Sequence, residues 1–227
     1  MLRIHVICEG QTEEMFVNEV MRSYFEKRGI HLQPALLGKP GHKGGNVQFQ
    51  RVLGDVQLRL LGDTSAYCTT FLDFYGLPES FPGKAEALQK NDLDAKNQTI
   101  CNAFSQQLEK HLGANAMRRF IPHIQFYEFE GLLFSSPQSI ANETNHAELQ
   151  RDLQQIRDQF DSPEHINNDP NTAPSKRIQA LIREYDKVIY GSLVALDIGF
   201  EKMRSECELF DTWVEKLLAL SDNNVSS

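Results

Sequence analysis

The chain has 227 residues and a formal net charge of −8, and 41% of its residues are hydrophobic. This length fits one domain, or one domain with a helical annex, and it can bury a substantial core. The acidic balance argues against a long, non-specific DNA footprint, which needs a largely basic surface. It still permits a local basic groove.

Two further features of the sequence indicate the cellular location of the protein. No apolar run approaches the ~20 residues that cross a bilayer, and the first residues, MLRIHVICEG, lack the layout of a signal peptide. The four cysteines are scattered with no C-x-x-C pair, which favours buried thiols over disulfides or a zinc site. We expect a cytoplasmic protein without membrane contact. The sequence leaves the oligomeric state open, a homo-oligomer included.

Predicted strands and helices alternate over residues 1–136. Residues 2–8 (LRIHVIC) form the first predicted strand, and Thr12 is placed to cap the helix that follows. Further strands are expected at 30–38, 65–74 and 119–130, and further helices at 47–62 and 99–113. The Gly-rich stretch 39–45 is interpreted as a connector or as a phosphate-contacting loop. The alternation predicts βαβ units and a mostly parallel sheet.

The pattern changes after Pro137. Helical stripes occur around 149–160, at 175–185 and through 210–217. We therefore predict an α/β domain over residues 1–136, with a helical annex over residues 137–227 packed on it.

Carboxylates occur where the predicted strands end. Glu9 follows the first strand, Asp73 ends the third, and Glu128 and Glu130 end the fourth. The carboxyl ends of parallel strands share one edge of the sheet, where ligand sites form. Residues two apart on a strand point to the same face, and Glu13 lies one helical turn beyond Glu9. Clustered oxygen ligands without His or Cys indicate Mg²⁺ or Mn²⁺, which commonly act on phosphates.

Plainer interpretations of these residues stay open. Glu13 and Glu14 suit the first turn of any helix because of the helix dipole. Asp73 fits a turn, and the Glu128/Glu130 pair fits a solvated strand edge. Lys176 follows Ser175, a predicted N-cap, in the segment TAPSKRI. Its amine is either a solvated charge or a cation that stabilises charge in phosphoryl transfer.

The segments EGQTEE and DFYG resemble the Toprim fold, whose pattern is a Glu in an E-G-x-x-E-like turn followed by Asp-x-Asp after a later strand. Tyr75 stands where the second Asp of that pattern would be. The resemblance implies that Glu9, Asp73, Glu128 and Glu130 ligate one or two metal ions, with Glu13 assisting.

More closely, the chain resembles a bacterial family of uncharacterised Toprim-like proteins, domain-of-unknown-function family 4276. The segments that carry this resemblance are EGQTEEMFVNEV, FLDFYGLPESFPG, FIPHIQFYEFEGLLFS and NTAPSKRI. It implies a partner of the ABC-type ATPase class and a metal-dependent nuclease that cleaves DNA or RNA in anti-phage defence. In that setting Glu9, Asp73 and Lys176 are the expected catalytic residues. The alternative is a non-catalytic Toprim-like partner that senses nucleic acid for the ATPase.

Overall fold

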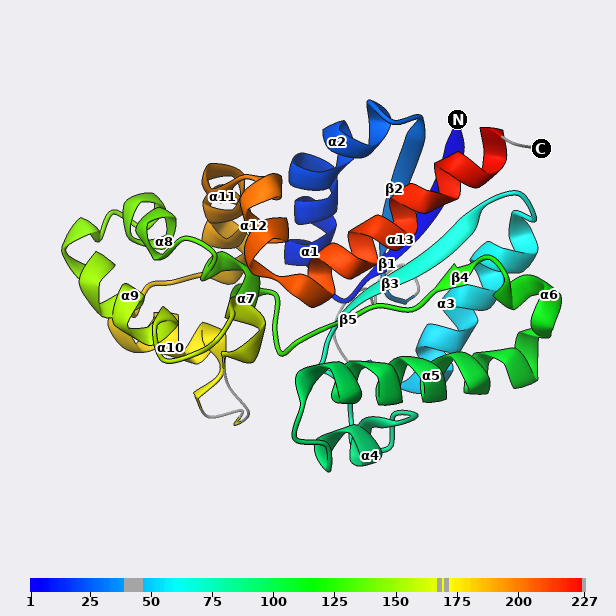
Figure 1. The fold of residues 1–227 in the computed structure, drawn as a ribbon, viewed down its shortest axis with the longest axis horizontal. Helices are drawn as coiled ribbons and strands as arrows, with labels where there is room; N and C mark the ends of the chain where they lie inside the picture. Colours follow the sequence, from blue (N-terminus) through cyan, green and yellow to red (C-terminus); the bar gives the residue numbers. More distant parts are fainter. Residues whose placement is uncertain (39–46, 167–168, 170–171, 226–227) are drawn as a thin grey trace.

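The computed structural model describes residues 1–38, 47–166, 169 and 172–225. Within these residues, five parallel strands form one sheet flanked by helices, which confirms the predicted α/β class (Figure 1). The strand order is β2 (Ile30–Leu36), β1 (Leu2–Cys8), β3 (Tyr67–Asp73) and then β4 (Phe120–Ile121), with β5 (Ile124–Gln125) also paired with β3. The Gly-rich stretch 39–45 lies outside the described residues.

The first βαβ unit begins with β1 and returns to β2. Helix α1 (Gln11–Phe16), the π-helical turn η1 (Val17–Met21) and helix α2 (Arg22–Glu26) connect the two strands. Their register runs from Leu2 opposite Ile30 to Cys8 opposite Leu36. The predicted cap at Thr12 is wrong: Gly10 is the N-cap, and the buried Thr12 hydroxyl has no hydrogen-bond partner among the described residues.

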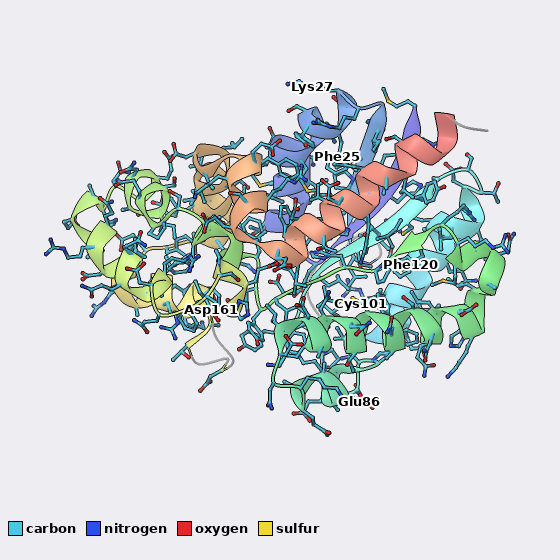
Figure 2. The ribbon with its side chains drawn as sticks, in the orientation of Figure 1. Phe25, Lys27, Glu86, Cys101, Phe120 and Asp161 are labelled. Carbon is cyan, nitrogen blue, oxygen red and sulfur yellow. The ribbon has the colours of Figure 1, made fainter. Side chains whose placement is uncertain are left out.

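Each face of the sheet has its own hydrophobic core. Helices α1, α2 and α13 (Glu208–Val225) cover one face, and α3 (Phe49–Gly62) and α5 (Leu93–Leu112) cover the other (Figure 1). Alternate residues of β1 supply both cores, since Val6 joins the first and Ile7 the second. Figure 2 shows Phe25 on the α2 side and Phe120 on the α5 side.

The remaining helices are short. Figure 1 shows α7 to α11 gathered beyond the carboxyl ends of β1 and β3. The division at residues 136 and 137 stays a prediction, and α13 shares a core with β1.

No helix in the described residues combines the length and apolar character of a membrane span. The remaining bounds are α4 (Lys84–Leu88), α6 (Ala114–Met117), α7 (Glu130–Leu133), α8 (Pro137–Glu143), η2 (Ala147–Leu149), α9 (Gln150–Arg157), η3 (Pro163–His165), α10 (Pro174–Leu181), α11 (Lys187–Ile198) and α12 (Phe200–Glu206).

The predicted fourth strand is wrong in its extent. Strands β4 and β5 have two residues each, Glu128 lies in no strand, and Glu130 begins α7. Pro122 has no N–H to donate and interrupts the ladder. At His123 the hydroxyl of Thr70 takes the place of the missing strand pairing. It donates to the carbonyl oxygen of His123 at 2.8 Å and accepts from the N–H of His123 at 3.2 Å. The prediction that a strand points Glu128 and Glu130 to one face therefore fails.

Candidate functional site

The ends of β1 and β3 are joined through a carboxylate. Glu9 follows β1, and its Oε2 accepts a hydrogen bond from the backbone N–H of Asp73 at 3.0 Å. Asp73 ends β3, and its Oδ1 accepts from the backbone N–H of Phe129 at 2.9 Å. This chain of contacts brings the segment around residue 129 to the carboxyl edge of the sheet, as the parallel topology predicts.

Two more carboxylates are held in the same way. Glu13 Oε2 accepts from the backbone N–H of Gly10 at 2.7 Å. Glu128 Oε2 accepts from the backbone N–H of Ser175 in the first turn of α10 at 3.1 Å. Glu9, Asp73, Glu13 and Glu128 thus each use one oxygen on a main-chain N–H. No hydrogen bond ties the second oxygen of any of them to the described part of the chain.

The fifth predicted ligand, Glu130, is buried at the start of α7. Its Oε1 and the Oε1 of Glu13 are buried without a hydrogen-bond partner in the described residues. A buried carboxylate oxygen without a donor is costly unless the group is protonated or meets a cation. Both side chains therefore have an unused acceptor inside the protein.

The acidities of these groups are strongly perturbed. Burial raises the pKa of Glu9 to about 7; the hydrogen bond from Asp73 opposes this, and the nearby Glu13 carboxylate adds to it. Burial likewise raises the pKa of Glu130 to about 7. For Asp73, burial and then the charges of Glu13, Glu9 and Glu130 hold the pKa well above its usual range. Burial also raises the pKa of Glu13. Such shifts are typical of functional sites.

Lys187 supplies positive charge to this group, and sequence reasoning missed it. Burial lowers its pKa, but attraction by the carboxylates, Glu130 and Asp73 first, outweighs that effect and raises the pKa above its usual value. Lys187 begins α11, whose N-cap is Asp186, with a side chain that accepts from the N–H groups of Val188 and Ile189. The Asp-Lys pair before an apolar run was the signal that could have located it.

The predicted lysine lies elsewhere. Lys176 is exposed on α10, and its amine donates to Gln179 Oε1 at 3.4 Å. The predicted N-cap at Ser175 is also wrong, because Ala173 is the N-cap and Pro174 opens the helix. The N–H of Ser175 is instead taken by Glu128.

Tyr75 and Gly76, which follow Asp73 closely in the chain, determine how much space the site has and which side chains border it. A Cβ added to Gly76 would lie 2.4 Å from Glu9 Oε1, so only glycine leaves room for that carboxylate. Tyr75, at the position of the second Toprim Asp, stacks on Tyr127 with ring centroids 5.2 Å apart. The side chain at that position therefore belongs to an aromatic pair, and Gly76 is a site residue that sequence reasoning missed.

The donor set fits a hard divalent cation. The available atoms are carboxylate oxygens, including the unpartnered Oε1 atoms of Glu13 and Glu130, and such ligands suit Mg²⁺ or Mn²⁺. As the side chains stand, however, no three His, Cys, Asp or Glu residues of the described chain form a group that could hold an ion. Binding would therefore require the free oxygens to move closer together.

Comparison with known families gives a match over most of the chain. Residues 8–218 match the family described as "Domain of unknown function (DUF4276)". The chain belongs to this family. The match confirms the family resemblance of the sequence, while the Toprim-like nature of the domain stays a proposal. No curated protein matches the chain.

Three solved structures of one protein resemble the chain in fold. They are crystal structures of the C-terminal region of the OLD protein of Xanthomonas campestris pv. campestris. The mercury-phased structure has a TM-score of 0.41 at 17% identity, with 98% of each chain covered. The iodine-phased structure has a TM-score of 0.36, also at 17% identity with 98% of each chain covered. Similarity at this level carries no argument about the site.

Proposed function

We propose that the protein is a metal-dependent nuclease that hydrolyses phosphodiester bonds of DNA or RNA through a Toprim-like site. One observation carries the proposal. Four carboxylates are each fixed by a backbone N–H through one oxygen, while the other oxygen has no hydrogen bond to the residues that the structure describes. Such main-chain anchoring orients ligands in advance, and it is the arrangement that oxygen-liganded cation sites need.

The proposed roles follow from the contacts. Glu9, Asp73, Glu13, Glu128 and Glu130 hold Mg²⁺ or Mn²⁺, and Glu9 and Asp73 are central because their backbone segments are tied to each other. When bound, the ion supplies Lewis-acid activation of the phosphate and of water. Lys187 offsets the charge of the carboxylates that we propose as metal ligands, so we assign charge stabilisation to it. A role for Lys176 stays a prediction.

The proposal extends to the biological setting. An ABC-type ATPase partner and a role in anti-phage defence follow from the family resemblance of the sequence. A nuclease effector controlled by such a partner fits an acidic chain with a net charge of −8, because that chain is poorly suited to holding nucleic acid unaided.

A second candidate function has its own support. In the described residues no ready-made group of three metal ligands exists, and an aromatic pair occupies the position of the second Toprim Asp. Both observations favour a non-catalytic module that binds nucleic acid or docks on the ATPase. In that case the buried carboxylates would be protonated, and Lys187 would compensate the charge that remains.

Replacement of Glu9 by Gln separates the two functions. The change keeps the size of the side chain and an oxygen that can accept from Asp73, but it removes a ligand charge. We expect Mn²⁺-dependent cleavage of single-stranded DNA, double-stranded DNA or tRNA to fall by orders of magnitude, while the metal-free melting temperature stays equal or rises because repulsion is relieved. The assay is run with and without the ATPase.

Glu14→Gln is the matched control, since Glu14 is a nearby glutamate in the first turn of α1 and is not among the proposed metal ligands. It should cleave like the unchanged protein. If Glu9→Gln also cleaves at the normal rate, the nuclease proposal is wrong. If no form cleaves any substrate under any condition, the binding module is the better account.

A further inference from the structure

Lys84 is a buried lysine that the proposed roles leave unused. Only 5% of its surface is exposed, although lysine is almost never fully buried without a partner. No ion pair between described residues includes Lys84. Its amine donates to the carbonyl oxygen of Phe74 and lies 3.5 Å from the centroid of the Phe74 ring. A buried ammonium group that makes these contacts is costly to maintain and needs an explanation.

The backbone that carries Lys84 is firmly seated. Lys84 is the first residue of α4, and the preceding Gly83 has φ +81°. A Cβ added at Gly83 would lie 2.8 Å from Ala103 Cβ and 2.9 Å from Ile100 Cα, so the start of α4 is pressed against α5. The lysine side chain therefore reaches from the start of α4, which is seated against α5, to Phe74 just beyond the end of β3.

The amine of Lys84 contacts the 74–76 corner, the turn of the chain that follows β3 and borders the candidate site. The N–H of Phe74 donates to Gln125 at 2.9 Å, and the N–H of Tyr75 donates to Tyr127 at 3.1 Å. The Phe74 carbonyl is the group that Lys84 holds. Two residues later, Gly76 packs directly against the Glu9 carboxylate. Any shift of this corner would therefore move the surface on which Glu9 rests.

We infer that Lys84 is a positioning residue for the divalent-cation site: by holding the Phe74 carbonyl it fixes the 74–76 corner and, through Gly76, the carboxylate of Glu9. This inference rests on the proposed function. A purely electrostatic role predicts the opposite effect on metal binding, because a positive charge near Glu9 repels a cation. The sign of the change in metal affinity therefore distinguishes the two roles.

The test is calorimetric titration of Mn²⁺ into the full chain and into Lys84→Met. Methionine has a similar length but no charge and no donor. We expect Mn²⁺ affinity to fall at least tenfold, as is typical when a group that orients a ligand is removed. The metal-free melting temperature should stay equal or rise, because a buried charge is replaced by an apolar group. Lys84→Arg, which keeps charge and donor, should recover most of the affinity.

Lys90→Met is the matched control, because Lys90 is exposed just beyond α4, and it should bind Mn²⁺ normally. Unchanged or tighter binding by Lys84→Met overturns the inference while leaving the proposed function intact. If the unchanged chain binds no Mn²⁺, the proposed function fails and the inference falls with it. Should Lys84→Met not fold, Lys84→Arg decides: normal affinity supports positioning, and weak affinity in a folded protein contradicts it.

Discussion

The side chains of the candidate site are oriented by contacts that the sequence alone does not reveal. Glu9 and Asp73 were predictable because each ends a buried strand. Nothing in the sequence indicated that the Glu9 carboxylate accepts from the main chain of Asp73. The same holds for the contact between Glu9 and Gly76, because it joins residues that are adjacent only after β1 and β3 have paired. Residue types at strand ends can be predicted, but the donors that orient them cannot.

Gly76→Ala tests that contact. The added methyl group would overlap Glu9 Oε1, so the carboxylate or the corner must move. We expect Mn²⁺ affinity to fall about tenfold and the free energy of unfolding to drop by ~1–3 kcal/mol, as in other overpacked sites. Calorimetry and urea unfolding measure the two effects. Gly54→Ala is the control, because a Cβ there meets no atom within 4 Å. Normal metal binding by Gly76→Ala would show that Glu9 is not held by this corner.

Lys187 and Lys176 can be compared directly. Lys187 interacts with four carboxylates, whereas Lys176 is exposed and bonded to Gln179. We expect Lys187→Met to lower the metal-free melting temperature at pH 8, where Glu9 and Glu130 are charged, and to have little effect at pH 5, where these two side chains are protonated. Lys176→Met should leave the melting temperature unchanged at both pH values. Equal changes in melting temperature for the two variants would show that Lys187 does not interact with the carboxylates of the site.

At the scale of elements, periodic stretches were predictable and irregular ones were not. Strands β1 and β3 lie where the hydrophobic pattern placed them, and helix α5 covers the predicted helix at 99–113 almost entirely but begins earlier, at Leu93. The fourth strand failed because Pro122 divides it and because a Thr70 side chain takes over its pairing. Helix α11 was overlooked although Asp186 caps it, since its sequence is apolar on several sides and lacks one clean stripe. Tertiary contacts decide such segments.

Helix α13 provides a pH prediction. Its first turn is capped from a distant segment: Glu164 accepts from the N–H groups of Leu209 at 2.8 Å and Phe210 at 2.9 Å. Burial raises the pKa of Glu164 to about 7, and the two hydrogen bonds oppose this. The folded state therefore binds the proton more tightly than the unfolded chain, whose pKa is near 4.5. Stability from this group is present below about pH 4.5 and is lost as the pH rises through 7.

Titration of Glu164 is expected to lower the free energy of unfolding by at most ~3 kcal/mol between pH 5 and 8, by the usual conversion of a pKa shift. Urea unfolding of the unchanged protein and of Glu164→Gln at both pH values isolates it. We expect the variant to be less stable at pH 5, where it loses one acceptor oxygen, and the difference to shrink at pH 8. Parallel pH profiles for the two proteins would mean that Glu164 does not titrate in this range.

At the scale of the whole molecule, the fold collects negative charge at one edge of the sheet. Carboxylates from the end of β1, from α1, from the end of β3 and from the segment entering α7 meet there, and α11 adds Lys187. The net charge of −8 adds to the local repulsion of phosphate. If nucleic acid is the substrate, as we propose, it is expected to approach this edge only when cations offset the charge. Binding of substrate and binding of metal are therefore expected to be coupled.

This coupling gives the last prediction. The isolated chain should bind DNA and RNA weakly in EDTA and more tightly in Mn²⁺, with a shallow dependence on salt because few phosphates are contacted. Fluorescence anisotropy with labelled, cleavage-resistant phosphorothioate oligonucleotides measures it, and Glu9→Gln should lose most of the gain from Mn²⁺. Adding the proposed ATPase partner should tighten binding by supplying the basic surface that the acidic chain lacks. Tight binding in EDTA that weakens steeply with salt would instead indicate a basic surface on this chain that holds nucleic acid away from the carboxylates.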